Sequence, residues 1–280
     1  MWKQKIGICI GKKTTTPTVD ILPLLKQIGF DAVSPAYRQD EDMTQIVQTA
    51  RDCGLFVESI HAPERKAADL WSSDASIREE ALTQLLQILR FCGQHKIPTV
   101  VCHVWIGYDY VFDANCLNFE AYDKMVDTAE EQGVQIAFEN TEGEEYLSAL
   151  MTRYANRPCV GFCWDSGHEM CYNHSQDMLA QYGDRLLITH LNDNLGISRF
   201  DGKIYSIDDL HLLPYDGVGD WDDIIARLRK LRKLEYLNFE MRVNPKPNRH
   251  ENDIYARMTP EEYFTEAYKR ACKVAYRYAR

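Results

Sequence analysis

The sequence predicts a single α/β domain, residues 1–280, built as one (β/α)8 TIM barrel. Short apolar, β-branched runs alternate with longer stretches of helical period along the chain. The short runs are almost continuously apolar, as in a parallel sheet that helices cover. The length of 280 residues suits such a barrel, which typically needs about 250 residues.

Eight segments are predicted as strands. Helical segments separate them, so successive strands are expected to pair in parallel through right-handed crossovers. An open doubly wound sheet is the alternative, but no Gly-x-Gly-x-x-Gly turn follows the first strand. The predicted strands are Lys5–Gly11, Phe30–Pro35, Leu55–His61, Thr99–Trp105, Val134–Asn140, Val160–Asp165, Leu186–Asp193 and Tyr236–Val243.

Two of the helices between and after these strands are well defined by their sequence. The last helix is predicted to begin at Thr259, with Pro260 in its first turn and Glu262 completing a capping box. Two long loops, Asn194–Asp220 and Asn244–Met258, exceed the usual length of a connection and are expected to be functional. The other helix has an apolar stripe at helical period, formed by Ile77, Ala81, Leu82, Leu85, Ile88, Leu89 and Cys92.

Composition and charge narrow the class of protein. No apolar run approaches the roughly 20 residues of a membrane span, and the N-terminus lacks the pattern of a signal peptide. The nine cysteines form no Cys-x-x-Cys pair, which predicts reduced thiols in a cytoplasmic protein. A formal net charge of −10 disfavours a general nucleic-acid partner. The oligomeric state stays open, with a homo-oligomer as one alternative.

Histidines and carboxylates gather at the C-terminal ends of the predicted strands. In a barrel these ends converge on the active site. Divalent metals need several oxygen or imidazole ligands from different elements, and strand ends hold such ligands rigidly. An unpaired carboxylate after an apolar run is costly to bury. The sequence therefore predicts a divalent-metal site among His61, His103, Glu139, Asp165, His168, His190, Asp209, His211 and Glu240.

The order of these residues resembles the xylose-isomerase-like TIM-barrel superfamily, which contains sugar and sugar-phosphate isomerases and epimerases and also endonuclease IV. The resemblance extends from Phe30 to about Arg242. In the epimerase branch it implies one Mn, Co, Mg or Zn ion held by Glu139, Asp165, His190 and Glu240, with the two glutamates as acid and base. It rests on Asp165-Ser-Gly-His168, on His190-Leu-Asn-Asp193, and on Asp209-Leu-His211 followed by Pro214-Tyr-Asp-Gly217 and Trp221.

The resemblance leaves two branches to compare. In endonuclease IV all nine positions bind three zinc ions, and this sequence keeps all nine residue types. His61, His103, His168, Asp209 and His211 are therefore expected to bind either a second metal or the substrate. The sequence departs from endonuclease IV by Glu64 in Ala-Pro-Glu, and by Glu142, Glu144 and Glu145 after Glu139-Asn-Thr. These added carboxylates would repel DNA phosphates, which favours the epimerase branch.

The expected function is a metal-dependent isomerase or epimerase of carbohydrate metabolism, acting on a small sugar, keto-sugar or sugar phosphate. A proton would move through an enediolate, with Glu139 and Glu240 as catalytic groups. Trp105, and with it Trp164, is expected to pack on the sugar, and Arg242 or Arg249 to bind a substrate anion. The alternatives are a zinc-dependent phosphoesterase similar to endonuclease IV, which acts on abasic DNA, and a non-catalytic metal or sugar sensor.

Overall fold

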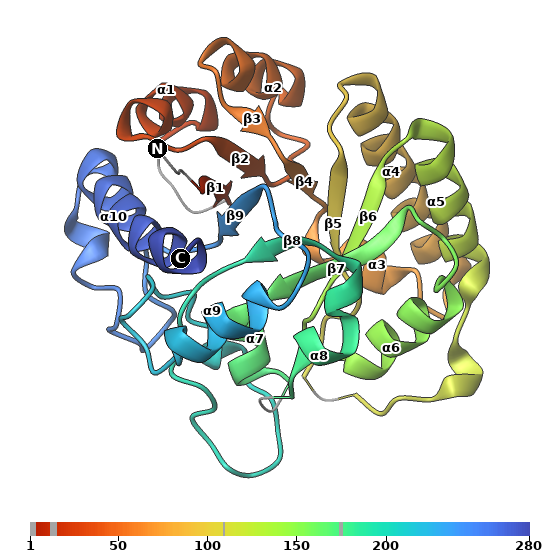
Figure 1. The fold of residues 1–280 in the computed structure, drawn as a ribbon. Coiled ribbons are helices and arrows are strands. Elements are labelled where there is room, and N and C mark those ends of the chain that lie inside the picture. Colours follow the sequence, from red (N-terminus) through yellow and green to blue (C-terminus); the bar gives the residue numbers. More distant parts are fainter. Residues whose placement is uncertain (1–3, 12–15, 109, 174–175) are drawn as a thin grey trace.

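The computed structural model describes residues 4–11, 16–108, 110–173 and 176–280. Its strands form a central barrel with the helices arranged around it (Figure 1). The strands are β1 (Lys5–Ile10), β2 (Ala32–Pro35), β3 (Phe56–Val57), β4 (Ser59–His61), β5 (Thr99–His103), β6 (Gln135–Glu139), β7 (Val160–Asp165), β8 (Leu186–His190) and β9 (Tyr236–Phe239).

All strand pairs are parallel and follow the orders β3-β2-β1-β9 and β4-β5-β6-β7-β8. Parallel bridges between Ala36 and His61, and between Leu191 and Phe239, join the two sheets at both seams. These bridges close the sheet on itself, so the predicted (β/α)8 fold is confirmed. The prediction of one strand over Leu55–His61 was wrong in one detail, because the structure has two strands on either side of Glu58, of which β3 pairs with β2 and β4 with β5.

The helices cover the outer face of the barrel. They are α1 (Thr18–Ile28), α2 (Met43–Asp52), α3 (Glu64–Asp69), α4 (Ala75–Gln94), α5 (Phe119–Gln132), α6 (Glu144–Arg153), α7 (Ser166–Cys171), α8 (Met178–Tyr182), α9 (Trp221–Arg229) and α10 (Pro260–Tyr278). The predicted capping box of Thr259 and Glu262 is present at α10. The predicted stripe of α4 is buried from Ala81 onward except for Leu82, which is partly buried, and Ile77, one turn earlier, is exposed. Within the described ranges, no helix combines the length and apolarity needed to cross a membrane.

Alternation along the strands determines which side chains enter the barrel. Val101, Ala137, Cys163 and Ile188 form a buried cluster of their own, separate from the large core between the strands and the helices. Side chains two residues apart on a strand share a face. The residues two positions further on therefore also point inward, at the C-terminal end of the barrel. They are His103, Glu139, Asp165 and His190.

A buried carboxylate, that of Glu58, lies between β3 and β4. Glu58 Oε2 and Asn238 Oδ1 are both buried without a hydrogen-bond partner among the described residues. Both oxygens approach Gly7, where a Cβ atom would lie 3.1 Å from Glu58 Oε2 and 2.8 Å from Asn238 Oδ1. Burial raises the pKa of the Glu58 carboxyl from 4.5 to about 8. Glu58 is therefore expected to keep its proton in the folded protein at neutral pH.

The Glu58→Gln variant is expected to be more stable than the wild type in mildly alkaline solution, by about 1–3 kcal/mol. Because the pKa of Glu58 is higher in the folded than in the unfolded chain, its contribution to stability is fully present below pH 4.5 and is lost as pH rises through about 8. Urea unfolding at about pH 5 and about pH 9 measures this difference. The exposed Glu235→Gln, which removes a partner of Lys5, is the control. An equal effect of Glu58→Gln at both pH values would contradict the prediction.

Candidate metal centre

The structure brings the nine predicted residues together at the C-terminal end of the barrel. His61, His103, Glu139, Asp165 and His190 are the last residues of β4, β5, β6, β7 and β8. Glu240 directly follows β9, His168 lies in α7, and Asp209 and His211 lie in the loop after β8. Each of the nine has at least one carboxylate–imidazole contact with another.

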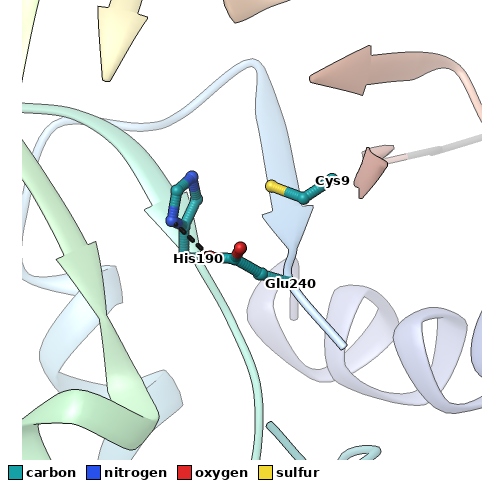
Figure 2. A group of neighbouring side chains, drawn as sticks. All are labelled: Cys9, His190 and Glu240. Atoms are coloured by element: carbon teal, nitrogen blue, oxygen red, sulfur yellow. Dashed lines mark ion pairs between the residues drawn. The ribbon is translucent and has the colours of Figure 1, made fainter. Parts of the chain in front are cut away.

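The central group consists of Glu139, Asp165, His190 and Glu240, whose ligand atoms all lie within 4.8 Å of one another. His190 Nδ1 is 2.9 Å from Glu139 Oε1 and 2.8 Å from Glu240 Oε2, and the Glu240 contact is drawn in Figure 2. Glu139, Asp165 and His190 are fully buried. Three carboxylates this close repel one another unless positive charge lies between them. The donor set of three carboxylates and one imidazole therefore fits a divalent cation.

Two flanking groups share ligands with the centre. His61 Nε2 and His103 Nε2 lie 3.3 and 3.2 Å from Glu139 Oε2, and these three residues form a second potential ligand group. Asp165, His168 and His211 form a third. Asp209 Oδ1 lies 2.6 Å from His211 Nδ1 and 3.5 Å from His168 Nε2, so it extends the third group. Because Glu139 and Asp165 are shared, the geometry offers places for up to three ions.

Backbone and amide groups orient several of these side chains. His61 Nδ1 contacts the carbonyl oxygen of Ala62 at 2.7 Å, and His168 Nδ1 contacts that of Asn140 at 3.0 Å. The second nitrogen of a metal-binding histidine commonly donates to such a carbonyl. Asp165 accepts from the His168 backbone N–H at 2.7 Å and from Asn192 Nδ2 at 2.8 Å. These contacts fix the rings and the carboxylate before any ion binds.

The electrostatics of the site attract positive charge. Burial opposes protonation of His168, but Asp165 and Asp209 outweigh it and raise its pKa to about 10. Burial likewise opposes ionisation of Glu139, yet the neighbouring His190 and His103 bring its pKa well below the ordinary value. The carboxylates thus hold positive charge on the histidines around them. A divalent cation can balance the same carboxylates instead, and its binding would release the protons from the histidines.

Two cysteines close to the centre were not predicted as site residues. Cys9, on β1, has its Sγ within 4.8 Å of ligand atoms of His190 and Glu240 (Figure 2). Asn238 Nδ2 donates to this sulfur at 3.1 Å. The Sγ of Cys163 likewise lies within 4.8 Å of ligand atoms of Glu139 and His190. Cys9 lies within an apolar run and is followed by Ile10, so its position did not mark it as a ligand in the sequence.

A cavity of about 270 Å³ opens above the centre. This is just below the roughly 300–1,000 Å³ of pockets that hold drug-sized ligands, so it suits a small molecule. Arg242 lines it, as do six of the nine site residues. Trp105 lies outside this lining, because its indole stacks on Tyr146 at 4.3 Å between ring centroids. The site residues in the lining are His61, His103, His168, Asp209, His211 and Glu240.

Trp164 and Arg249, which the sequence also predicted to contact the substrate, have other partners in the structure. Trp164 is fully buried and donates through Nε1 to Glu169 at 2.9 Å. Arg249 pairs with Glu251 at 2.8 Å. Neither residue is part of the cavity lining. Of Trp105, Trp164, Arg242 and Arg249, only Arg242 borders the cavity.

The fold and the site define a (β/α)8-barrel protein whose potential metal ligands converge at the C-terminal ends of its strands. The chain belongs to the xylose isomerase-like TIM barrel family, whose family model matches residues 22–258. The resemblance found in the sequence is therefore confirmed.

One curated relative and several solved structures are similar to this chain. The uncharacterized protein y4fM of Sinorhizobium fredii (strain NBRC 101917 / NGR234) is 36% identical over 156 residues, which are 51% of this chain and 47% of that protein. The match thus spans about half the length of this relative.

Among solved structures, the IolI protein with a bound zinc atom has a TM-score of 0.74 at 18% identity, over 97% of this chain and 98% of that one. D-Psicose 3-epimerase in the presence of D-fructose has a TM-score of 0.65 at 17% identity, over 95% and 97% of the two chains. The 3-keto-D-glucoside 4-epimerase YcjR of E. coli has a TM-score of 0.65 at 13% identity, over 95% and 98%. These likenesses establish the shared fold.

Proposed function

We propose that this protein is a divalent-metal-dependent isomerase or epimerase of a small sugar or keto-sugar. The observation that carries the proposal is that ligand atoms of Glu139, Asp165, His190 and Glu240 lie within 4.8 Å of one another, beside a small cavity that Glu240 lines. The solved structures with this fold include a zinc-bound protein and epimerases of sugars, which agrees with the proposal.

The four central residues would hold the ion, which when bound would supply Lewis-acid polarisation of a substrate carbonyl. Glu139 and Glu240 come from strands three apart in the barrel, β6 and β9. One glutamate would take a proton from the carbon beside the carbonyl, and the other would return it to the resulting enediolate. His190 contacts both carboxylates through Nδ1 and holds them in place. His168 and His211 would bind substrate hydroxyls.

Incubation of the metal-loaded protein with ketoses in deuterated water is expected to introduce deuterium at the carbon beside the carbonyl of the substrate. The exchange follows from removal of a proton to a carboxylate that equilibrates with solvent. Proton NMR of D-fructose, D-psicose and D-tagatose measures it, with chelator-treated protein as the control. Lack of exchange in every ketose tested, together with catalytic cleavage of a duplex containing an abasic site, would reject the proposal.

A zinc-dependent phosphoesterase similar to endonuclease IV is the second candidate. The observation in its favour is the presence of three ligand groups that share Glu139 and Asp165. Glu64 and Glu142 in the cavity lining oppose it, because they would repel the row of phosphates on a DNA backbone, which a single cation such as Arg242 does not neutralise. The net charge of −10 acts in the same direction. A sensor without turnover would bind metal and sugar but exchange no deuterium.

A further inference from the structure

Arg242 occupies a fixed position at the cavity. Its backbone N–H donates to the carbonyl of His211 at 2.8 Å, and its own carbonyl accepts from Asn252 Nδ2 at 2.9 Å. Its Nε donates to the carbonyl of Asn244 at 3.0 Å. Hydrogen bonds thus hold the backbone of Arg242 to the site residue His211 and its Nε to the following loop. This leaves the two terminal nitrogens to face a ligand.

The cavity has a second cation, Lys246, but that charge is already balanced. Lys246 Nζ lies 3.0 Å from Asp209 Oδ2 and donates to the carbonyl of Ser206 at 2.8 Å. Arg242, by contrast, has no carboxylate within 4.0 Å anywhere in the described ranges, and its terminal nitrogens have no hydrogen-bond partner there. Among the described arginines and lysines that line the cavity, Arg242 is therefore the one available to a ligand.

The surroundings of Arg242 make a counter-ion favourable. The side chain is half-buried, and burial lowers its pKa, although the guanidinium stays charged at neutral pH. A partly desolvated charge without a partner costs free energy that an anion recovers. The planar fork of a guanidinium matches the paired oxygens of a carboxylate or phosphate. The whole protein is acidic and Glu64 also lines the cavity, so a local cation of this kind favours an anionic ligand where the overall charge does not.

From these contacts we infer that the substrate of this site carries a carboxylate or a phosphate at the end away from its reacting carbons, and that Arg242 binds that group. The inference rests on the proposed function, since it assigns the reacting end of the substrate to Glu139, Asp165, His190 and Glu240. The substrate is then a sugar acid or a sugar phosphate. Arg242 thus selects a negatively charged substrate, whereas the four central residues carry out the reaction.

Three molecules that differ only at carbon 6 provide the test: D-fructose, D-fructuronate and D-fructose 6-phosphate. Calorimetric titration of the metal-loaded protein is expected to show at least one anion binding about 10–100-fold more tightly than D-fructose. The better of the two anions identifies the group as carboxylate or phosphate. Arg242→Gln is expected to remove the preference, so that neither anion binds more tightly than D-fructose. Arg242→Lys is expected to retain part of it, because it keeps the charge and loses the fork.

Arg249→Gln is the matched control, because Arg249 is a nearby cation that pairs with Glu251 and lies outside the cavity lining. It is expected to keep the full preference. Equal affinity for all three molecules, failure of both anions to bind, or a preference that survives in Arg242→Gln would overturn the inference. Deuterium exchange in neutral ketoses without any anion preference would overturn it and leave the proposed function intact. An Arg242-dependent preference without exchange in any of the three molecules would instead reject the proposed function.

Discussion

Replacement of Glu240 by glutamine is expected to reduce turnover by about 10²–10⁴-fold while the barrel stays folded. Among the four central residues, Glu240 combines contact with His190 Nδ1 at 2.8 Å with a side chain that is 27% exposed and lines the cavity. It can therefore reach a substrate from the cavity side. Glutamine keeps the size and one ligand oxygen but cannot accept a proton, so the base is lost.

Steady-state rates and circular dichroism of Glu240→Gln check this expectation. Elemental analysis of the variant separates loss of the base from loss of the metal, because a variant that keeps its ion but not its rate has lost only the proton acceptor. Glu120→Gln on the surface of α5, where Glu120 pairs with Lys124, serves as the control. Near-normal turnover by Glu240→Gln would mean that this residue is neither the base nor an essential ligand.

Removal of the metal is expected to abolish turnover and to lower the temperature of unfolding. The carboxylates of Glu139, Asp165 and Glu240 lie within 4.8 Å of one another and repel each other once the cation is removed. This repulsion destabilises the folded state relative to the unfolded chain. An ion that binds only the folded protein contributes about 2.7 kcal/mol when its concentration is 100 times Kd. Thermal unfolding and activity are measured after chelation and again after addition of Mn, Co, Zn or Mg. Full activity of protein shown by elemental analysis to contain no metal would contradict the expectation.

The number of bound ions distinguishes the two candidate enzymes. We expect the central group to bind one ion much more tightly than the flanking groups, because it offers three carboxylates around a single point. Asp165→Asn is expected to lose that ion, and the exposed His250→Asn, whose ring pairs with Asp253, is expected to keep it. Three tightly held zinc ions bridged by Glu139 and Asp165 would instead favour the phosphoesterase.

The barrel and the residues of the centre could be predicted from the sequence for one physical reason. Parallel strands that all enter the barrel from the same side end on the same rim, so a polar residue after each apolar run must face that rim. Glu139, Asp165 and His190 could be placed there because each ends such a run. The capping box at Thr259 was predictable because its contacts lie within one helical turn.

Contacts between separate strands and loops were decided only by the tertiary structure. The sequence placed nine potential ligands on one rim, but strand order and tilt determine that Glu139 is shared by His61, His103 and His190. The same long-range geometry turns Trp105 onto Tyr146.

It also balances Lys246 with Asp209 and leaves Arg242 without a carboxylate partner in the described part of the chain. The periodicity of a sequence records which face of its own strand or helix a side chain occupies. It contains no distance between elements, and ligand groups, ion pairs and stacked rings all depend on such distances.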